Sequence, residues 1–433
     1  MKTSPLFAPR RSAFSVIGFG VASLALATTT ARAQQALTDA IANDKSADAR
    51  LQQEQSPDYT YKNGDFRMLL VPSLTLGWND NVNLTQNNPI SDFIITPAVG
   101  LSLSYPLSEQ NLLQLNLNVG YSRYVSHDEL SSLYLQSGSE LSFDFYIKDI
   151  LFNVHDRIGY EQDAAQNADI AGTGSYGNFQ NTAGLSGQWA IKKTHFTLGY
   201  DHEDSLATTS QFSDTDLSSE MVYGLVGYEL NSELMAGVEA SGSMTRYRQN
   251  VLNDNNSYSG GVYADWRPGS FFRVQPRAGY VRYLFQNNSP NLKTSDLGTW
   301  YASVNVSHQA ADWMSYSLEV GREVGLGLQA DVNEDWYVRP AISWSFIKEF
   351  PFQTSLFFQH GKQGAGSTLL VPNQNLVGSE TYDWYGGDIA VSHPITKQLT
   401  LGLDYRLTQR SSSLANRGYT QNLVSLQLVY HPK

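Results

Sequence analysis

Strict alternation of apolar and polar side chains runs through the stretch from Asn111 to Tyr124. One parity is apolar and consists of Leu113, Leu115, Leu117, Val119 and Tyr121. The other parity carries amide, glycine and hydroxyl residues, namely Gln114, Asn116, Asn118, Gly120 and Ser122. Because successive side chains of a β-strand point to opposite faces, this pattern predicts a strand with one apolar and one polar face. Its length suits a transmembrane strand, which takes roughly nine to eleven tilted residues.

The preceding segment, 93–105, alternates in the same way, and a short turn at 106–110 joins the two stretches. Together they predict a transmembrane β-hairpin. From Phe66 onward the chain repeats this unit, with long polar loops alternating with short turns such as Lys148-Asp149. We expect about eighteen strands, with sixteen as the next even count, because the parity of residues 217–230 is unclear.

The pattern therefore predicts an all-β protein, a single antiparallel up-and-down transmembrane β-barrel over residues 66–433. An even number of strands places both ends of the barrel on one side of the membrane. Aromatic residues gather near the predicted strand ends, as interfacial girdles require; they include Trp78, Tyr105, Tyr121, Tyr160, Trp189, Trp266, Trp300 and Trp336. The rival architecture is a β-propeller, whose blades also recur at roughly 40 residues. A blade divides that length among four short strands, whereas this chain divides it between two long ones.

Composition agrees with a membrane barrel. The chain has 433 residues, of which 16% are charged, and it contains no cysteine. The lack of cysteine excludes disulfides and thiolate metal sites. The formal net charge of −12 argues against nucleic acid as a partner. Beyond the amino terminus, no window approaches the run of about 18 apolar residues that a spanning helix needs, so membrane insertion requires a closed barrel.

The first 33 residues have the features of an export signal. Basic residues Lys2, Arg10 and Arg11 precede a mostly apolar run at 13–27, and Ala31-Arg32-Ala33 forms a small-x-small cleavage site. The sequence predicts a cleaved signal peptide at 1–33, with an uncleaved anchor as the alternative. Residues 34–65 are rich in Ala, Gln, Asp and Lys and predict a flexible periplasmic segment, with a plug in the lumen as the alternative.

The stretch 71–104 resembles the opening of the β-barrel porin families of Gram-negative outer membranes. Those families begin with an alternating strand, an N-D-N-V-type turn and an S-D-x-I segment followed by proline. The matching residues are Asn79, Asp80, Asn81, Val82, Ser91, Asp92, Ile94 and Pro97. The resemblance implies an outer-membrane location with lipid and lipopolysaccharide as neighbours. Some relatives belong to exopolysaccharide systems, which adds polysaccharide as an expected partner.

Such barrels commonly end on an aromatic residue that the barrel-assembly machinery reads, so this machinery is a further expected partner. Here Tyr430 fits that position, but His431, Pro432 and Lys433 follow it. The resemblance therefore implies a displaced assembly signal.

The inward parity carries the candidates for selectivity, because a barrel of this size is too wide for side chains to fill and charges in a pore set selectivity. These candidates are Glu140, Asp144, Glu239, Arg273, Arg277, Glu319 and Arg339. The three arginines lie apart from the acids Glu140, Asp144 and Glu239 along the chain, which predicts a transverse field across the lumen. The alternative is local pairing of Arg277 and Arg339 with Glu319. Inward tyrosines predict either a stacking track for sugars or packing near turns; they are Tyr134, Tyr146, Tyr301 and Tyr337.

Motifs for chemistry are weak. Outward His202 and His308 lack a recognisable nucleophile motif, and the acidic turns at 79–81 and 253–256 lack the further ligands of a calcium loop. We expect no enzyme, no catalytic residues, no cofactor and no metal. The expected function is that of a porin-like channel for passive diffusion of small polar solutes or saccharides. The alternatives are a non-enzymatic component of exopolysaccharide export and a structural outer-membrane protein without conductance.

Overall fold

A computed structural model describes residues 59–432, except 109, 291, 329, 348 and 365–378. The expected signal peptide, residues 34–58 of the expected segment 34–65 and most of the loop expected at 362–381 lie outside the described residues. Those expectations stay predictions. No helix among the described residues is long and apolar enough to cross a membrane.

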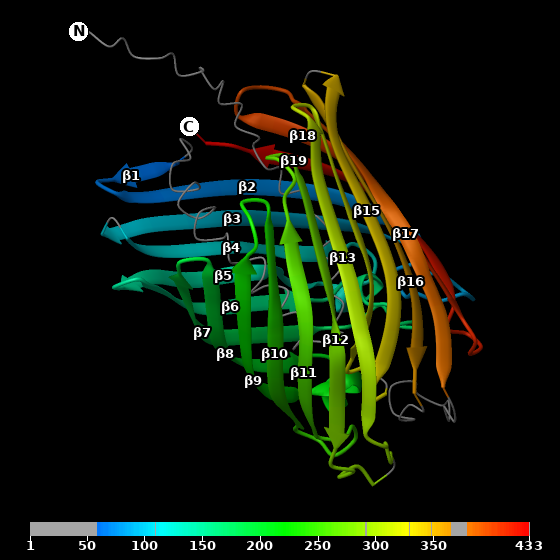
Figure 1. The fold of residues 1–433 in the computed structure, drawn as a ribbon. Helices are drawn as coiled ribbons and strands as arrows, with labels where there is room; N and C mark the ends of the chain where they lie inside the picture. The colour runs from blue at the N-terminus through cyan, green and yellow to red at the C-terminus, as the bar shows by residue number, and fades with distance from the viewer. Residues whose placement is uncertain are drawn as a thin grey trace.

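The described chain forms one closed antiparallel barrel in which each strand pairs with its neighbours along the sequence (Figure 1). Its wall consists of the eighteen strands β2 to β19, which confirms the expected number. The strands are β1 (Tyr61–Asn63), β2 (Phe66–Asn79), β3 (Asp92–Ser108), β4 (Asn111–Tyr124), β5 (Ser132–Ile147), β6 (Ile150–Glu161), β7 (Asn178–Ile191), β8 (Thr194–Ala207), β9 (Leu217–Glu229), β10 (Leu234–Tyr247), β11 (Asn255–Trp266), β12 (Phe272–Phe285), β13 (Leu297–Ala311), β14 (Met314–Gly325), β15 (Asn333–Ile347), β16 (Phe350–Gln363), β17 (Glu380–Pro394), β18 (Leu399–Ser412) and β19 (Tyr419–Tyr430).

Short turns and long loops alternate around the barrel and lie at its opposite ends. The turn between β5 and β6 is the two residues Lys148-Asp149, with Lys148 at a positive φ of 57°. Positive φ suits the tight turns whose twist matches the flanking strands. The longer loops hold three short 3₁₀ helices, η1 (Asp128–Leu130), η2 (Ala164–Gln166) and η3 (Ser210–Thr215).

The seam between the first and last wall strands is short. β19 pairs with β2 only from Ser73 to Asn79. β3 occupies the other edge of β2 along almost its whole length. The small strand β1 therefore covers Phe66 to Met68 on the edge that β19 leaves free.

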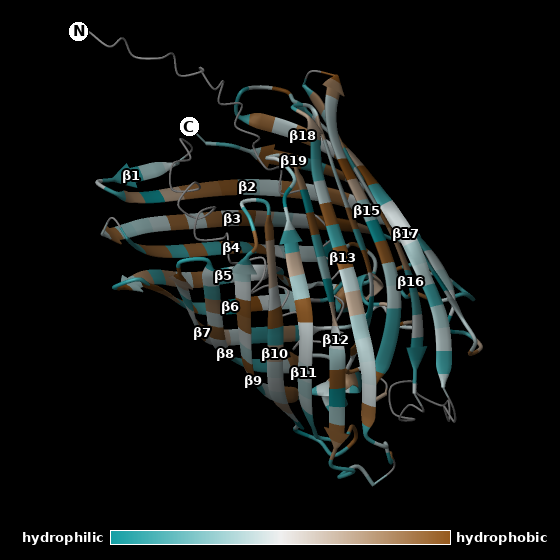
Figure 2. Cartoon of the chain, viewed as in Figure 1, coloured by the Kyte–Doolittle hydropathy of each residue, from teal (hydrophilic) through white to brown (hydrophobic). Residues whose placement is uncertain are grey.

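Apolar side chains on the wall strands are exposed, as the alternation predicts, and apolar and polar residues interchange along the strands (Figure 2). Leu198 and Val262 are 66% and 58% exposed, which identifies the outer surface as a contiguous apolar belt. Such a surface is far larger than the patches that soluble monomers expose, and it matches contact with lipid. Exposed aromatics lie near the short turns, such as Trp189 and Trp266, and near the long loops, such as Trp300 and Trp336.

The segment of unclear parity, 217–230, is strand β9. Its outward side chains include Val222, Val226 and Tyr228, which are exposed. Its inward side chains Met221, Tyr223 and Leu225 are buried against Tyr263. Both faces of this strand are apolar, and for this reason alternation alone left its orientation open.

Candidate functional site: a lumen crossed by a strap

The loop between β6 and β7, residues 162–177, folds into the barrel and is called the strap. It leaves the wall at Glu161 and returns at Asn178. Its middle contacts the inner faces of β15 to β18, which lie across the ring from β6 and β7. The strap therefore spans the lumen and divides it.

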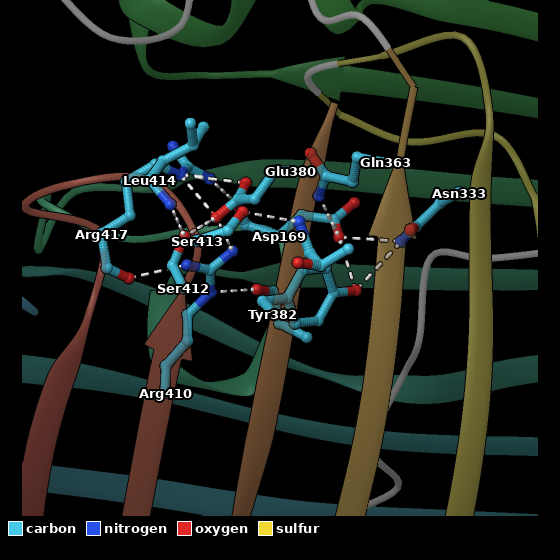
Figure 3. Close-up of polar contacts among 12 residues, drawn as sticks. Asp169, Asn333, Gln363, Glu380, Tyr382, Arg410, Ser412, Ser413, Leu414 and Arg417 are labelled. Atoms are coloured by element: carbon cyan, nitrogen blue, oxygen red, sulfur yellow. Dashed lines mark hydrogen bonds and ion pairs between the residues drawn. The ribbon is translucent and has the colours of Figure 1, made fainter. Parts of the chain in front are cut away.

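The far end of the strap is held by Asp169 (Figure 3). Its Oδ1 accepts hydrogen bonds from Asn333 Nδ2 at 2.9 Å and from Gln363 Nε2 at 2.7 Å. The backbone N–H of Leu328 donates to its Oδ2 at 3.3 Å. Asp169 is 2% exposed, and burial raises the pKa of its carboxyl despite these donors.

The Tyr382 hydroxyl joins Asp169 to a second buried carboxyl. It lies 3.1 Å from Asp169 Oδ1 and 2.9 Å from Asp335 Oδ1. A phenol has one proton to donate. When it donates to one carboxylate, the other contact requires a proton on the second carboxyl. The docked strap therefore favours one bound proton at this pair.

Two buried arginines bind the backbone at the same end of the strap (Figure 3). Arg410 Nε donates to the carbonyl of Ala168 at 2.7 Å, and Arg417 Nη2 donates to the carbonyl of Asp169 at 2.9 Å. Glu380 bridges the two guanidinium groups, because its Oε1 lies 2.8 Å from Arg410 and 3.0 Å from Arg417. Charge-assisted bonds in a buried setting are the stronger kind, so this cluster fixes the strap firmly.

The near end of the strap is held by Asp163. Its Oδ1 accepts the backbone N–H of Ala165 at 3.1 Å and so caps the helix η2. Its Oδ2 accepts Arg406 Nη2 of β18 at 2.6 Å. Burial opposes ionisation of Asp163, but the Arg406 guanidinium outweighs it and lowers the pKa of the carboxyl.

Apolar side chains pack the strap against neighbouring loops. Ile170 and Phe212 are each 1% exposed, and they belong to one buried cluster that joins the strap to four other parts of the long-loop end. The cluster consists of Leu84, Ala164, Ala165, Ile170, Tyr176, Phe212, Leu328 and Tyr419. The strap therefore combines polar anchors at its wall contacts with a small apolar core.

A cavity, called the passage below, lies between the strap and the wall formed by β19 and β2 to β5. Its volume is about 210 Å³. Wall hydroxyls and three tyrosines line one side, and Gln162, Asp163, Gln166 and Arg406 line the other. A second, wider hollow of about 640 Å³ lies at the long-loop end between the 80–91 loop and the loop that joins β18 to β19.

The predicted selectivity residues lie on the inner wall, but they pair locally. Arg277 Nε lies 2.6 Å from Glu239 Oε1, and the Tyr301 hydroxyl donates to the same carboxylate at 2.5 Å. Glu239 is therefore not separated from Arg277, and the predicted transverse field is wrong for this pair. The alternative named Glu319 as the partner of Arg277, whereas the ion pair that the structure shows for Arg277 is with Glu239.

The other candidates are paired across adjacent strands or at a turn. Arg339 lies 3.4 Å from Glu319, as the pairing alternative predicts. Glu140 lies 3.6 Å from Arg157, and Arg273 lies 2.8 Å from Asp265. Asp144 accepts a hydrogen bond from Asn153 Nδ2 at 2.6 Å.

The predicted tyrosine track is wrong for two of its four members. Tyr301 and Tyr337 are 3% and 5% exposed, and each ring lies over a glycine of the preceding strand, Gly279 and Gly321 respectively. A ring covered in this way packs the wall and offers no face to a solute. Tyr134 and Tyr146 stay partly exposed.

The motif residues that carried the family resemblance tie the first strand to the last. Asp80 accepts the backbone N–H of Asn422 at 2.7 Å and its Nδ2 at 2.6 Å. Asn81 donates to the carbonyl of Thr420 at 2.8 Å, and Asn79 accepts the N–H of Asn81 at 2.9 Å. These bonds staple the long-loop end of the β2–β19 seam.

The second half of the motif fixes the following loop and strand. Asp92 accepts backbone N–H groups of Ser126 and His127, the latter at 2.9 Å. Ser91 is exposed just before β3, and Pro97 faces outward on β3 opposite Leu74. The motif is thus accounted for by barrel closure and loop docking.

Sequence reasoning missed the strap and its anchors. The available signal was the composition of residues 162–177, where Ala164, Ala165, Ala168 and Ile170 are more apolar than a solvated loop needs. Buried loops require partners for their backbone groups, and here Arg410 and Arg417 supply two of them.

Taken together, the closed wall, apolar outer belt, polar inner face and internal strap define the class of this protein as a transmembrane-type β-barrel with a constricted lumen. The β-barrel fold that the sequence predicted is thereby confirmed.

Comparison with known proteins adds solved structures of the same general kind. The chain is similar to Pseudomonas aeruginosa OccK2 (OpdF) in complex with glucuronate, with 8% identity, a TM-score of 0.47 and coverage of 84% of this chain and 98% of that one. P. aeruginosa OccK5 (OpdH) has 12% identity and a TM-score of 0.45, with coverage of 84% of this chain and 98% of that one. For Acinetobacter baumannii OccAB3 they are 10%, 0.45, 85% and 99%. These similarities are too distant to assign a solute or a site residue. No family model and no curated protein matches the chain.

Proposed function

We propose that this protein is a channel for passive diffusion of small polar solutes across the outer membrane of a Gram-negative cell. One observation carries the proposal: a closed eighteen-strand wall is apolar outside and polar inside, and a polar cavity lies beside the strap. A barrel of this width holds water rather than a packed core. The strap sets the size of what passes.

The lumen candidates keep a role in this proposal as local ion pairs. Arg277 with Glu239, and Arg339 with Glu319, place compensated charges on the wall. Such pairs order water and solute dipoles without a strong field across the pore. Replacement of one partner exposes a net charge, which is the way these residues influence selectivity.

Refolded protein in planar lipid bilayers tests the proposal. We expect stepwise single-channel conductance after insertion, and a larger conductance for a variant with strap residues 164–175 replaced by a short Gly-Ser linker. A matched control exchanges the outer loop residues 414–416 for the same linker. Protein that inserts as a folded barrel without any conductance would contradict the channel and favour a structural role.

The remaining expectations from the sequence stay predictions. They are export with cleavage after Ala33, contact with lipopolysaccharide and insertion by the assembly machinery. A role in exopolysaccharide export is an alternative that no contact in the described chain favours. The wall strand β19 ends at Tyr430, and the N–H of His431 donates to the carbonyl of Gln398 at 2.7 Å.

A further inference from the structure

We propose that the passage between the strap and the wall of β2 to β5 recognises uncharged polyhydroxylated solutes of monosaccharide size. This inference deepens the proposed channel function and rests on it. The passage of about 210 Å³ is smaller than the roughly 300–1,000 Å³ of pockets for drug-sized ligands, so it suits one small ring.

A row of hydroxyl groups crosses four neighbouring strands at one height of the passage. Thr75 of β2 pairs with Thr96 of β3, and Ser122 of β4 pairs with Ser132 of β5. The two halves join through Thr96 Oγ1 and Ser122 Oγ, which lie 3.2 Å apart. All four residues line the passage. A hydroxyl both donates and accepts hydrogen bonds, so this row can match the hydroxyls of a sugar in either direction.

Two tyrosines flank the row along the direction of the strands. Tyr134 pairs with Gly120, four residues along β4 from Tyr124, which places the two levels about 14 Å apart at a rise of about 3.4 Å per residue. Both tyrosines line the passage. An aromatic ring offers an apolar face to the C–H face of a sugar and a hydroxyl to its edge. The hydroxyl row can therefore bind the hydroxyl groups of a pyranose, and the tyrosine rings can pack against its C–H face.

The strap side of the passage carries no net charge. Asp163 and Arg406 form an ion pair at 2.6 Å, in which the Arg406 side chain is 8% exposed and the Asp163 side chain 35%. The amides of Gln162 and Gln166 stand beside them. A charged solute would have to give up water without gaining an opposite charge, which is costly. An uncharged polyol instead gains acceptors from Asp163 and donors from the amides.

Block of ion current by sugars tests the proposal on the full-length barrel in planar bilayers. Glucose is expected to reduce the current of the wild-type channel in a saturable way, and gluconate to require roughly fivefold higher concentration. The double variant Thr96→Val, Ser122→Ala should raise the half-blocking concentration of glucose roughly fivefold, the effect of about one lost hydrogen bond. The variant that combines Thr96→Ser with Ser122→Ala keeps a hydroxyl at position 96. Its half-blocking glucose concentration should equal that of the single variant Ser122→Ala.

A second hydroxyl pair on the far wall provides the matched control. Ser241 and Ser259 lie on β10 and β11 with their hydroxyls 2.6 Å apart, outside the passage. The variant Ser241→Ala, Ser259→Ala should keep the wild-type half-blocking concentration. Current without block by glucose, or equal block in the Thr96, Ser122 variant, would overturn the recognition site while leaving the channel intact. Absence of current in folded wild-type protein would overturn the channel itself.

Discussion

At the scale of single residues, the inner wall holds charges that are buried and compensated. Glu239 accepts hydrogen bonds from both Arg277 and Tyr301, and its side chain is fully shielded in the described chain. Glu319 forms the equivalent contact with Arg339 but keeps 37% of its side chain exposed. Loss of the Glu239 charge therefore leaves a buried arginine without its partner, whereas loss of the Glu319 charge affects a partly exposed ion pair.

Glu239→Gln should destabilise the barrel by about 3–5 kcal/mol, because it leaves the Arg277 charge buried without its partner. Glu319→Gln should cost only about 0–1 kcal/mol, as for exposed pairs. The temperature at which the folded band is lost in semi-native gel electrophoresis measures the difference. Equal shifts for the two variants would show that the Glu239 pair is not decisive.

Gly361 is a second residue whose size matters, because the ring of Tyr382 lies over it. In Gly361→Ala the new methyl would overlap this ring and displace the hydroxyl that binds Asp169, so we expect a loss of about 1–3 kcal/mol and a higher open conductance. Gly100 on β3 is the control, since an added Cβ there makes ordinary contacts with Val71 O at 3.6 Å and Val71 Cβ at 3.8 Å. Conductance of Gly361→Ala that matches Gly100→Ala would refute the link between ring and strap.

At the scale of elements, the strap is a loop that side chains of the inner wall hold at both of its ends. Its two carboxyl anchors respond oppositely to pH. The pKa of Asp163 is lowered, so its anchor is present above about pH 3.9 and is lost as pH falls through that lowered pKa. The pKa of Asp169 is raised, so its contribution is full below about pH 3.9 and is lost as pH rises through the raised value.

The strap should therefore loosen as pH increases from 4 to 8, a range in which Asp163 stays ionised. We expect single-channel conductance to rise over this range in the wild-type protein. Asp169→Asn cannot titrate and should remove most of this rise, while Asp214→Asn, on a loop outside the strap, should retain it. A pH profile that is identical in wild type and Asp169→Asn would exclude this anchor as the cause.

Alternation predicted the hairpins, the number of strands and which face of a strand lies outside the barrel, because these features depend on the local sequence pattern. It did not predict which inward residues meet. Glu239 and Arg277 lie on β10 and β12 with β11 between them, so their contact depends on two successive registers and not on parity. The strap docking depends on Asp169 reaching β15 to β17 across the ring, a contact that no local pattern contains.

At the scale of the whole molecule, acidic side chains outnumber basic ones. The sequence has 41 acidic and 29 basic residues. On the described wall strands, the inward acids are Asp92, Glu140, Asp144, Asp201, Glu203, Glu229, Glu239, Asp265, Glu319, Glu323, Asp335, Glu380, Asp388 and Asp404, and the inward arginines are Arg67, Arg157, Arg273, Arg277, Arg339, Arg406 and Arg410. The potential inside the lumen should therefore be negative.

The channel should consequently prefer potassium over chloride, with a permeability ratio above one from the reversal potential in a salt gradient. The preference should grow at low salt, since the screening length increases from about 10 Å at 0.1 M to about 30 Å at 0.01 M. A ratio at or below one in dilute salt would contradict a negative lumen.

The small hairpin strand β1 also bears on how the cylinder completes itself. It occupies Phe66 to Met68 on the same edge of β2 that β19 uses from Ser73 onward. The last strand, β19, therefore pairs only with the part of this β2 edge that lies beyond β1, from Ser73 to Asn79. Because β1 occupies Phe66 to Met68, β19 cannot shift its pairing toward the start of β2. β1 therefore restricts the register in which the barrel closes.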